Sequence, residues 1–295
     1  MATDIQPTQQ SWGRILLSAI VFYLLSLGAL LLTGNPNLFP TVVLIGVFMV
    51  PAAYAAFFYD HRQLSQLSAG AVIRSFLYGG LLGVLAASLL EPLFVQSLTP
   101  SAILTVAMIE EFAKILGVIV IAWNMRHDAE IDGIILGSAA GMGFAALESM
   151  GYAFTGFLRS GGSLSVTVYL TLIRAVMSPL GHGTWTAILA SVLFREARNG
   201  HFRLNWKVLG AYATVVLLHT MWDLLPFVMA SFLLPGLDLF IGQLTVGLIG
   251  LLILWRRWRE GLRLQQLSVA GSSMEGGPLS PPPPLVPASK PGGES

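Results

Sequence analysis

Hydrophobic residues gather into long runs along the chain, and short polar stretches separate them. A helix needs roughly 20 mainly apolar residues to cross the hydrocarbon core of a bilayer. Eight runs of about this length lie near residues 14–33, 40–59, 72–95, 102–124, 133–157, 166–194, 207–228 and 233–255. Turn-forming residues mark the links, as in Thr33-Gly34-Asn35-Pro36 and Gly161-Gly162-Ser163. The pattern predicts an all-α, polytopic transmembrane bundle of about eight helices.

Composition supports this interpretation and narrows the possible chemistry. Hydrophobic residues make up 55% of the chain and charged residues 11%, whereas soluble domains carry about 25% charged residues. Apart from one cluster near the end of the chain, the basic residues form no dense run, so the sequence lacks a signature of nucleic-acid binding. We therefore expect the lipid bilayer as a partner and no nucleic acid. Cysteine is absent, which excludes disulfides and thiolate chemistry. Any nucleophile or metal ligand must be a hydroxyl, an imidazole, a carboxylate or water.

Orientation follows from the placement of Lys and Arg. Of the 16 basic residues, 13 lie before the first run, after the eighth, or in alternate links between them. The opposite side has only Arg159, while Lys114 and Arg174 lie inside runs. Because basic residues favour the cytoplasmic side, both termini are predicted to be cytoplasmic.

The two ends of the chain differ from the predicted bundle, residues 14–263. Residues 1–13 are polar and lack the charge and cleavage pattern of a signal peptide, so they predict a short cytoplasmic N-terminus. Residues 264–295 include a segment rich in Pro, Gly and Ser, which predicts a disordered cytoplasmic tail.

Several ionisable residues lie inside the apolar runs, where charge is costly and usually functional. Glu110, Glu111 and Lys114 share the fourth run, and the spacings of three and four residues place the lysine beside both carboxylates. Adjacent carboxylates repel, so one can act as a base while the other serves as a ligand or an acid. The alternative is a salt bridge that only orients helices.

The next three runs contribute further ionisable groups. Glu148 follows Gly137, Gly141 and Gly143, small residues that let another helix approach closely. His182 follows Pro179, which is expected to break its helix. A third pair, His219 and Asp223, are four residues apart and therefore share a helix face. Each histidine alone is more often a hydrogen-bonded core residue than a ligand, but the concentration of polar groups in four consecutive runs indicates one site.

Three functions fit such a site. A proton-coupled transporter also uses chains of Glu, His and Asp within the membrane. Its halves are often related by pseudo-symmetry, and no internal repeat is evident in the sequence. A non-catalytic membrane scaffold would not need all these carboxylates. The third function, hydrolysis within the membrane, uses them directly.

The motifs resemble the PrsW family of intramembrane proteases, which is related to the CAAX prenyl endopeptidase superfamily. The matching patterns span about residues 105–225. They are Glu110-Glu111-x-x-Lys114, Asp128–Gly133, Phe144-x-x-x-Glu148, His182 after Arg174 and Pro179, and His219-x-x-x-Asp223.

The resemblance implies an intramembrane peptidase that hydrolyses a peptide bond of a membrane-spanning or membrane-anchored protein. It also implies a prokaryotic plasma (inner) membrane as the location. We expect Glu111 or Glu110 to activate a water. The histidines either bind a divalent metal such as Zn²⁺ or stabilise the oxyanion without metal. The predicted catalytic residues are Glu110, Glu111, Lys114, Glu148, His182, His219 and Asp223; the predicted metal ligands are Glu111, Glu148, His182 and His219.

Overall fold

The computed structural model describes residues 11–62, 65–97, 99–123, 125, 129–198, 200–229 and 237–275, and within these ranges it contains helices and no β-strand. The helices are α1 (Ser11–Thr33), α2 (Phe39–Asp60), α3 (Ala69–Arg74), α4 (Gly80–Phe94), α5 (Pro100–Ala122), α6 (Glu130–Arg159), α7 (Leu164–Met177), α8 (His182–Arg195), α9 (Trp206–Met229) and α10 (Leu237–Glu275). Short turns of other helix types lie at Pro36–Leu38 (η1), Ser75–Gly79 (η2) and Ser178–Leu180 (η3). The predicted all-α bundle is confirmed.

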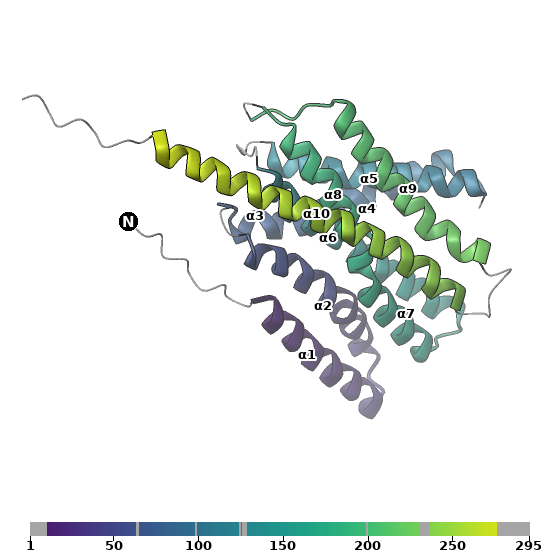
Figure 1. Cartoon of the computed structure of the whole chain (residues 1–295). Coiled ribbons are helices and arrows are strands. Elements are labelled where there is room, and N and C mark those ends of the chain that lie inside the picture. The colour runs from purple at the N-terminus through teal and green to yellow at the C-terminus, as the bar shows by residue number, and fades with distance from the viewer. Residues whose placement is uncertain are drawn as a thin grey trace, which may run out of the picture.

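Each hydrophobic run corresponds to one helical segment, if α3 to α4 and α7 to α8 are each taken as one interrupted segment. Among the described residues, six segments are long and apolar enough to cross a membrane: those beginning at Ser11, Pro36, Ala69, Glu130, Leu164 and Trp206. The segment α5 carries three ionisable residues in its middle, and its crossing remains a prediction, as does that of α10. In Figure 1, α1 begins and α10 ends on the same side of the bundle, as an even number of crossings requires.

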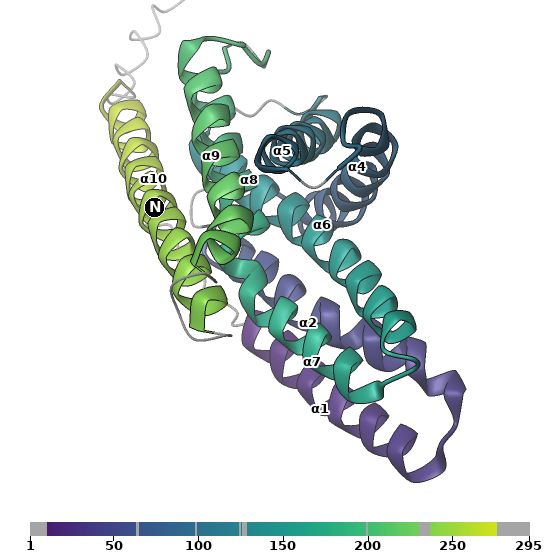
Figure 2. The same ribbon diagram turned by 90° about the vertical axis from the view of Figure 1, so that its right-hand side faces the viewer.

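Two helices form the centre of the bundle. Figure 2 shows α6 between the group of α1, α2 and α7 on one side and α4 and α5 on the other, and α6 and α8 are buried along most of their lengths. They pack closely because α6 presents glycines to α8: a Cβ at Gly137 would meet Thr186 and Ala187, and a Cβ at Gly141 would meet the carbonyl of His182. The predicted close approach at these glycines is confirmed.

The break before α8 also follows the sequence. Pro179 lies in η3, and the chain resumes as α8 at His182 after Gly181. Proline lacks the N–H that a continuous helix requires. As a result, His182 lies in the first turn of a new helix inside the bundle rather than in the middle of a long one.

The C-terminal end of the bundle differs from the expected boundary at residue 264. Helix α10 continues to Glu275, because Arg263, Leu264 and Gln265 are good helix formers and no proline occurs between Arg263 and Pro278. Buried Glu130 at the start of α6 pairs with Arg257 in the middle of α10 at 3.0 Å between Oε1 and Nε, which holds this part of α10 against the bundle. Residues 276–295 and Asp128 lie outside the described residues.

Candidate active site

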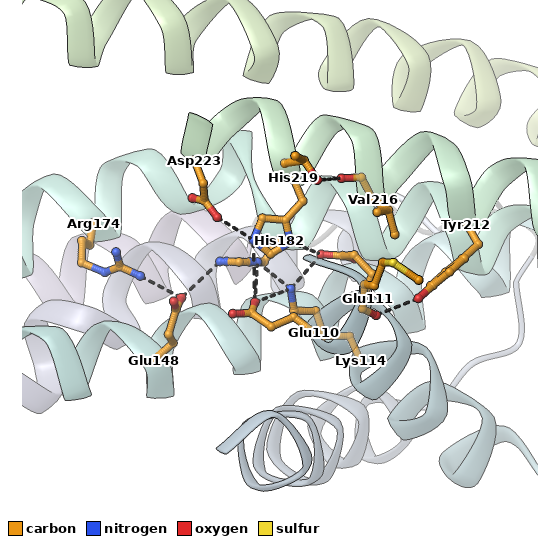
Figure 3. Close-up of polar contacts among 12 residues, drawn as sticks. Glu110, Glu111, Lys114, Glu148, Arg174, His182, Tyr212, Val216, His219 and Asp223 are labelled. Atoms are coloured by element: carbon orange, nitrogen blue, oxygen red, sulfur yellow. Dashed lines mark hydrogen bonds and ion pairs between the residues drawn. The ribbon is translucent and has the colours of Figure 1, made fainter. Parts of the chain in front are cut away.

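All seven predicted site residues lie in one connected cluster of polar contacts. They come from four helices: α5 supplies Glu110, Glu111 and Lys114, α6 supplies Glu148, α8 supplies His182, and α9 supplies His219 and Asp223. Figure 3 shows these side chains converging in a row that ends at Arg174 on one side and Tyr212 on the other. The packing of the four helices therefore joins groups that are more than 100 residues apart in sequence, such as Glu111 and His219.

Lys114 is the cation at the centre of the cluster. Its Nζ donates hydrogen bonds to Oε2 of Glu110 at 3.1 Å and to Oε1 of Glu111 at 2.8 Å, as the spacing predicted. The same Nζ lies 2.7 Å from Nδ1 of His182 and 4.2 Å from the centroid of the Phe144 ring. An ammonium group can only donate, so Nδ1 of His182 accepts. All three N–H groups of the fully buried lysine have an acceptor.

Glu148 holds the other nitrogen of His182. Nε2 of His182 lies 3.1 Å from Oε2 of Glu148, and that oxygen accepts a hydrogen bond from Nη2 of Arg174 at 2.7 Å. Nε of Arg174 donates to Oγ of Ser149 at 3.1 Å. Sequence reasoning did not include Arg174 among the catalytic residues, although a cation inside an apolar run was a visible signal. Arg174 compensates the charge of Glu148, and Glu148 fixes the imidazole.

Glu111 holds His219 in the same way. Nδ1 of His219 lies 3.0 Å from Oε1 of Glu111, and because a carboxylate only accepts, Nδ1 donates. In the neutral imidazole the lone pair is then on Nε2, which faces Oδ2 of Asp223 at 3.4 Å and Oε2 of Glu110 at 3.8 Å. The ring stacks on Trp185 with centroids 4.8 Å apart. Trp185, which sequence reasoning missed, is fully buried and fixes the plane of the ring.

Three of these residues form a compact set of metal donors. One ligand atom each of Glu110, His182 and His219 lies within 4.8 Å of the other two. Two imidazoles and one carboxylate match a catalytic zinc site with an open position, and each imidazole is oriented by a second carboxylate, as is usual around metals. The metal ligands expected from the sequence included both histidines, but they contained Glu111 and Glu148 in place of Glu110. In the structure these two carboxylates each contact one nitrogen of a histidine, Glu111 at His219 and Glu148 at His182.

The cluster borders a large cavity. Its volume is about 1020 Å³, and its lining includes Glu110, Glu148, His182, His219 and Asp223. Glu111 and Lys114 are not among the lining residues. Val95 and Thr99, between α4 and α5, line the same cavity, which therefore extends from that loop to the buried cluster. A peptide segment could reach Glu110 and both histidines through this space.

The contact of α6 with α8 at Gly141 sets the position of His182. Substitution of this glycine therefore tests whether the site depends on that position. Gly141→Ala would place a methyl group against the His182 carbonyl. We expect hydrolytic activity to fall about 100-fold, because displacement of an active-site group by about 1 Å has effects of this size. The loss of stability should be about 1–3 kcal/mol, as for other overpacked sites. Gly151→Ala is the matched control, since its Cβ would enter open space on the same helix. Equal activity of the two variants would refute this role of the glycine contact.

Comparison with known proteins agrees with the geometry. Residues 68–255 match the family described as PrsW family intramembrane metalloprotease. A curated relative, Protease PrsW of Halalkalibacterium halodurans, is 28% identical over 186 residues, covering 61% of this chain and 81% of the relative. No solved structure matches the chain. Since the family match spans more than half of the chain and includes every residue of the cluster, this integral membrane protein belongs to the PrsW family of intramembrane metalloproteases.

Proposed function

We propose that the protein hydrolyses a peptide bond of a membrane-spanning or membrane-anchored protein at the cluster. Glu110 receives the proton of the attacking water if the site works without metal, and it is an ion ligand if the site holds one. One observation carries the proposal: Glu110 lines the 1020 Å³ cavity together with both histidines. A general base must come within hydrogen-bond reach of the proton that it takes. Glu111 is not among the residues that line the cavity, and we assign it the positioning of His219.

The two histidines complete the site in one of two ways. In the metal-dependent form, Glu110, His182 and His219 would hold a divalent ion, for which Zn²⁺ is the best candidate by donor type. Such an ion would polarise the scissile carbonyl and lower the pKa of bound water. In the metal-free form, a protonated His219 would donate a hydrogen bond from Nε2 to the oxyanion, because the neutral ring presents only a lone pair there. The close spacing of the three donor atoms and the contact of each imidazole with a further carboxylate favour the metal-dependent form.

Lys114 limits when an ion can bind. Its ammonium donates to Oε2 of Glu110 and to Nδ1 of His182, the atoms that an ion would need. We therefore propose that Lys114 withdraws from these atoms when an ion binds and remains paired with Glu111. Asp223, which lines the cavity beside Nε2 of His219, is then the carboxylate free to take a proton from a bound water.

Metal analysis and cleavage assays test the proposal together. Purified protein reconstituted in vesicles with candidate single-pass proteins should cut them, and His182→Ala should abolish the cut. Bound metal measured by mass spectrometry, and loss of cleavage on chelation with recovery on adding Zn²⁺, would support the metal-dependent form. Full activity of a metal-free sample would rule that form out. Cleavage unchanged by His182→Ala would refute the site.

The proposal also covers the part of the chain that carries the activity and the membrane in which the protein resides. The helical bundle from α1 to α10, with the motif core at about 105–225, carries the activity, and both termini are cytoplasmic. The protein resides in a prokaryotic plasma membrane, which the organism of the bacterial relative supports.

A further inference from the structure

A second, smaller cavity lies beside His182. Its volume is about 220 Å³, and residues of α6, α7, α9 and α10 line it together with the break before α8. It shares Arg174, His182, Trp222 and Gln243 with the larger cavity. The two cavities therefore adjoin at the imidazole of His182, and a chain in the larger cavity would have the smaller one beside it.

The smaller cavity is suited to an uncharged group. Its apolar lining comes from Ala145, Leu170, Ile173, Met177 and Trp222. The two ionisable groups in its wall are already paired, since Arg174 bonds Glu148 and Ser149, and His182 bonds Glu148 and Lys114. A charged substrate side chain would find no unpaired opposite charge among the lining residues and would lose its hydration.

Size restricts the occupant further. A dry cavity of about 150 Å³ lined by Leu, Ile and Phe holds a benzene molecule. A cavity of about 220 Å³ therefore accepts a side chain of the size of Leu, Met or Phe. Tyr169, which lines it, is 57% exposed, so the cavity reaches the outer surface of the bundle at α7. An apolar segment in the surrounding lipid would present such side chains there.

We propose that this cavity is a specificity pocket, which binds the Leu-, Met- or Phe-sized apolar side chain of the substrate residue adjoining the scissile bond. The inference rests on the proposed function and adds a substrate class to it. The pocket determines where along an apolar segment the chain is cut, because one methylene gained or lost in an apolar pocket changes the rate about 10- to 200-fold.

Ile173 provides the test, since it lines the pocket and is half-buried. Ile173→Trp fills the pocket and Ile173→Ala enlarges it. The matched controls are Val176→Trp and Val176→Ala on the same helix, because Val176 is 60% exposed and is not a lining residue. The probe is a mixture of synthetic single-span peptides with randomised residues in the apolar segment. The peptides are incubated with the full chain in detergent, and the cut ends are sequenced by mass spectrometry.

Wild-type protein should cut beside Leu, Met or Phe. Ile173→Trp should shift the preference at least about tenfold towards Ala, Gly and Ser, and Ile173→Ala should extend it to Trp. Both Val176 variants should cut as wild type does. An unchanged preference in Ile173→Ala, with cleavage still dependent on Glu110, would overturn the pocket and leave the proposed function intact. If the wild-type and Glu110→Gln proteins produce the same fragments, the proposed function fails and the pocket fails with it.

Discussion

Glu110→Gln should lower the rate of peptide hydrolysis by about 10²- to 10⁴-fold, the range typical of a lost general base, which is the role of Glu110 in the metal-free form. The substitution keeps the size of the side chain and removes its charge at the wall of the cavity. Glu111→Gln should have the smaller effect of about 10- to 100-fold, because Glu111 acts through Nδ1 of His219 and residues behind a reacting group contribute on that scale. Cleavage rates in reconstituted vesicles measure both.

The order of the two effects is the informative result. Glu260→Gln is the control, since the Glu260 side chain is 50% exposed on α10 and pairs only with Arg195 and Arg257 among the contacts of the described residues. Its rate should stay near wild type. A rate for Glu110→Gln above half of wild type, or a larger loss for Glu111→Gln than for Glu110→Gln, would show that the roles of the adjacent carboxylates are assigned incorrectly.

Lys114→Met should tighten metal binding by at least about tenfold. Two unit charges 4 Å apart repel by about 4 kcal/mol in a partly polar medium, and a divalent ion is repelled more. Since about 1.4 kcal/mol corresponds to a factor of ten, relief of even part of this repulsion is measurable. The substitution also frees Oε2 of Glu110 and Nδ1 of His182 for the ion. Competition with a chromophoric zinc chelator gives the affinities without any substrate.

The same variant should be less stable when metal-free. Removing one partner of a buried ion pair costs about 3–5 kcal/mol, because the remaining charges are left unpaired. Zn²⁺ should restore much of this stability, since a ligand that binds only the folded state stabilises it. Thermal unfolding with and without Zn²⁺ measures the effect. Lys207→Met, whose side chain is 65% exposed, is the control for loss of a lysine. Equal or weaker metal binding by Lys114→Met would refute the competition between lysine and ion.

The sequence by itself determined the elements of the site. Hydrophobic runs predicted every helical segment, because length and apolar content are local properties. The same local geometry predicted that Lys114 bonds both neighbouring carboxylates and that Pro179 separates His182 from the preceding helix. The extension of α10 to Glu275 was not predicted. Residues 264–275 were grouped with the Pro- and Gly-rich tail, although several of them form helix readily.

Only the tertiary structure decided which carboxylate faces the cavity and which orients a histidine. Adjacent residues on a helix point about 100° apart, so the sequence placed Glu110 and Glu111 equally well in either role. The position of α5 against α9 makes Glu110 the lining residue and Glu111 the partner of His219. Likewise, the pairing of Glu148 with His182 depends on the approach of α8 to α6 at Gly141. Such contacts join distant segments, and their geometry depends on how helices cross.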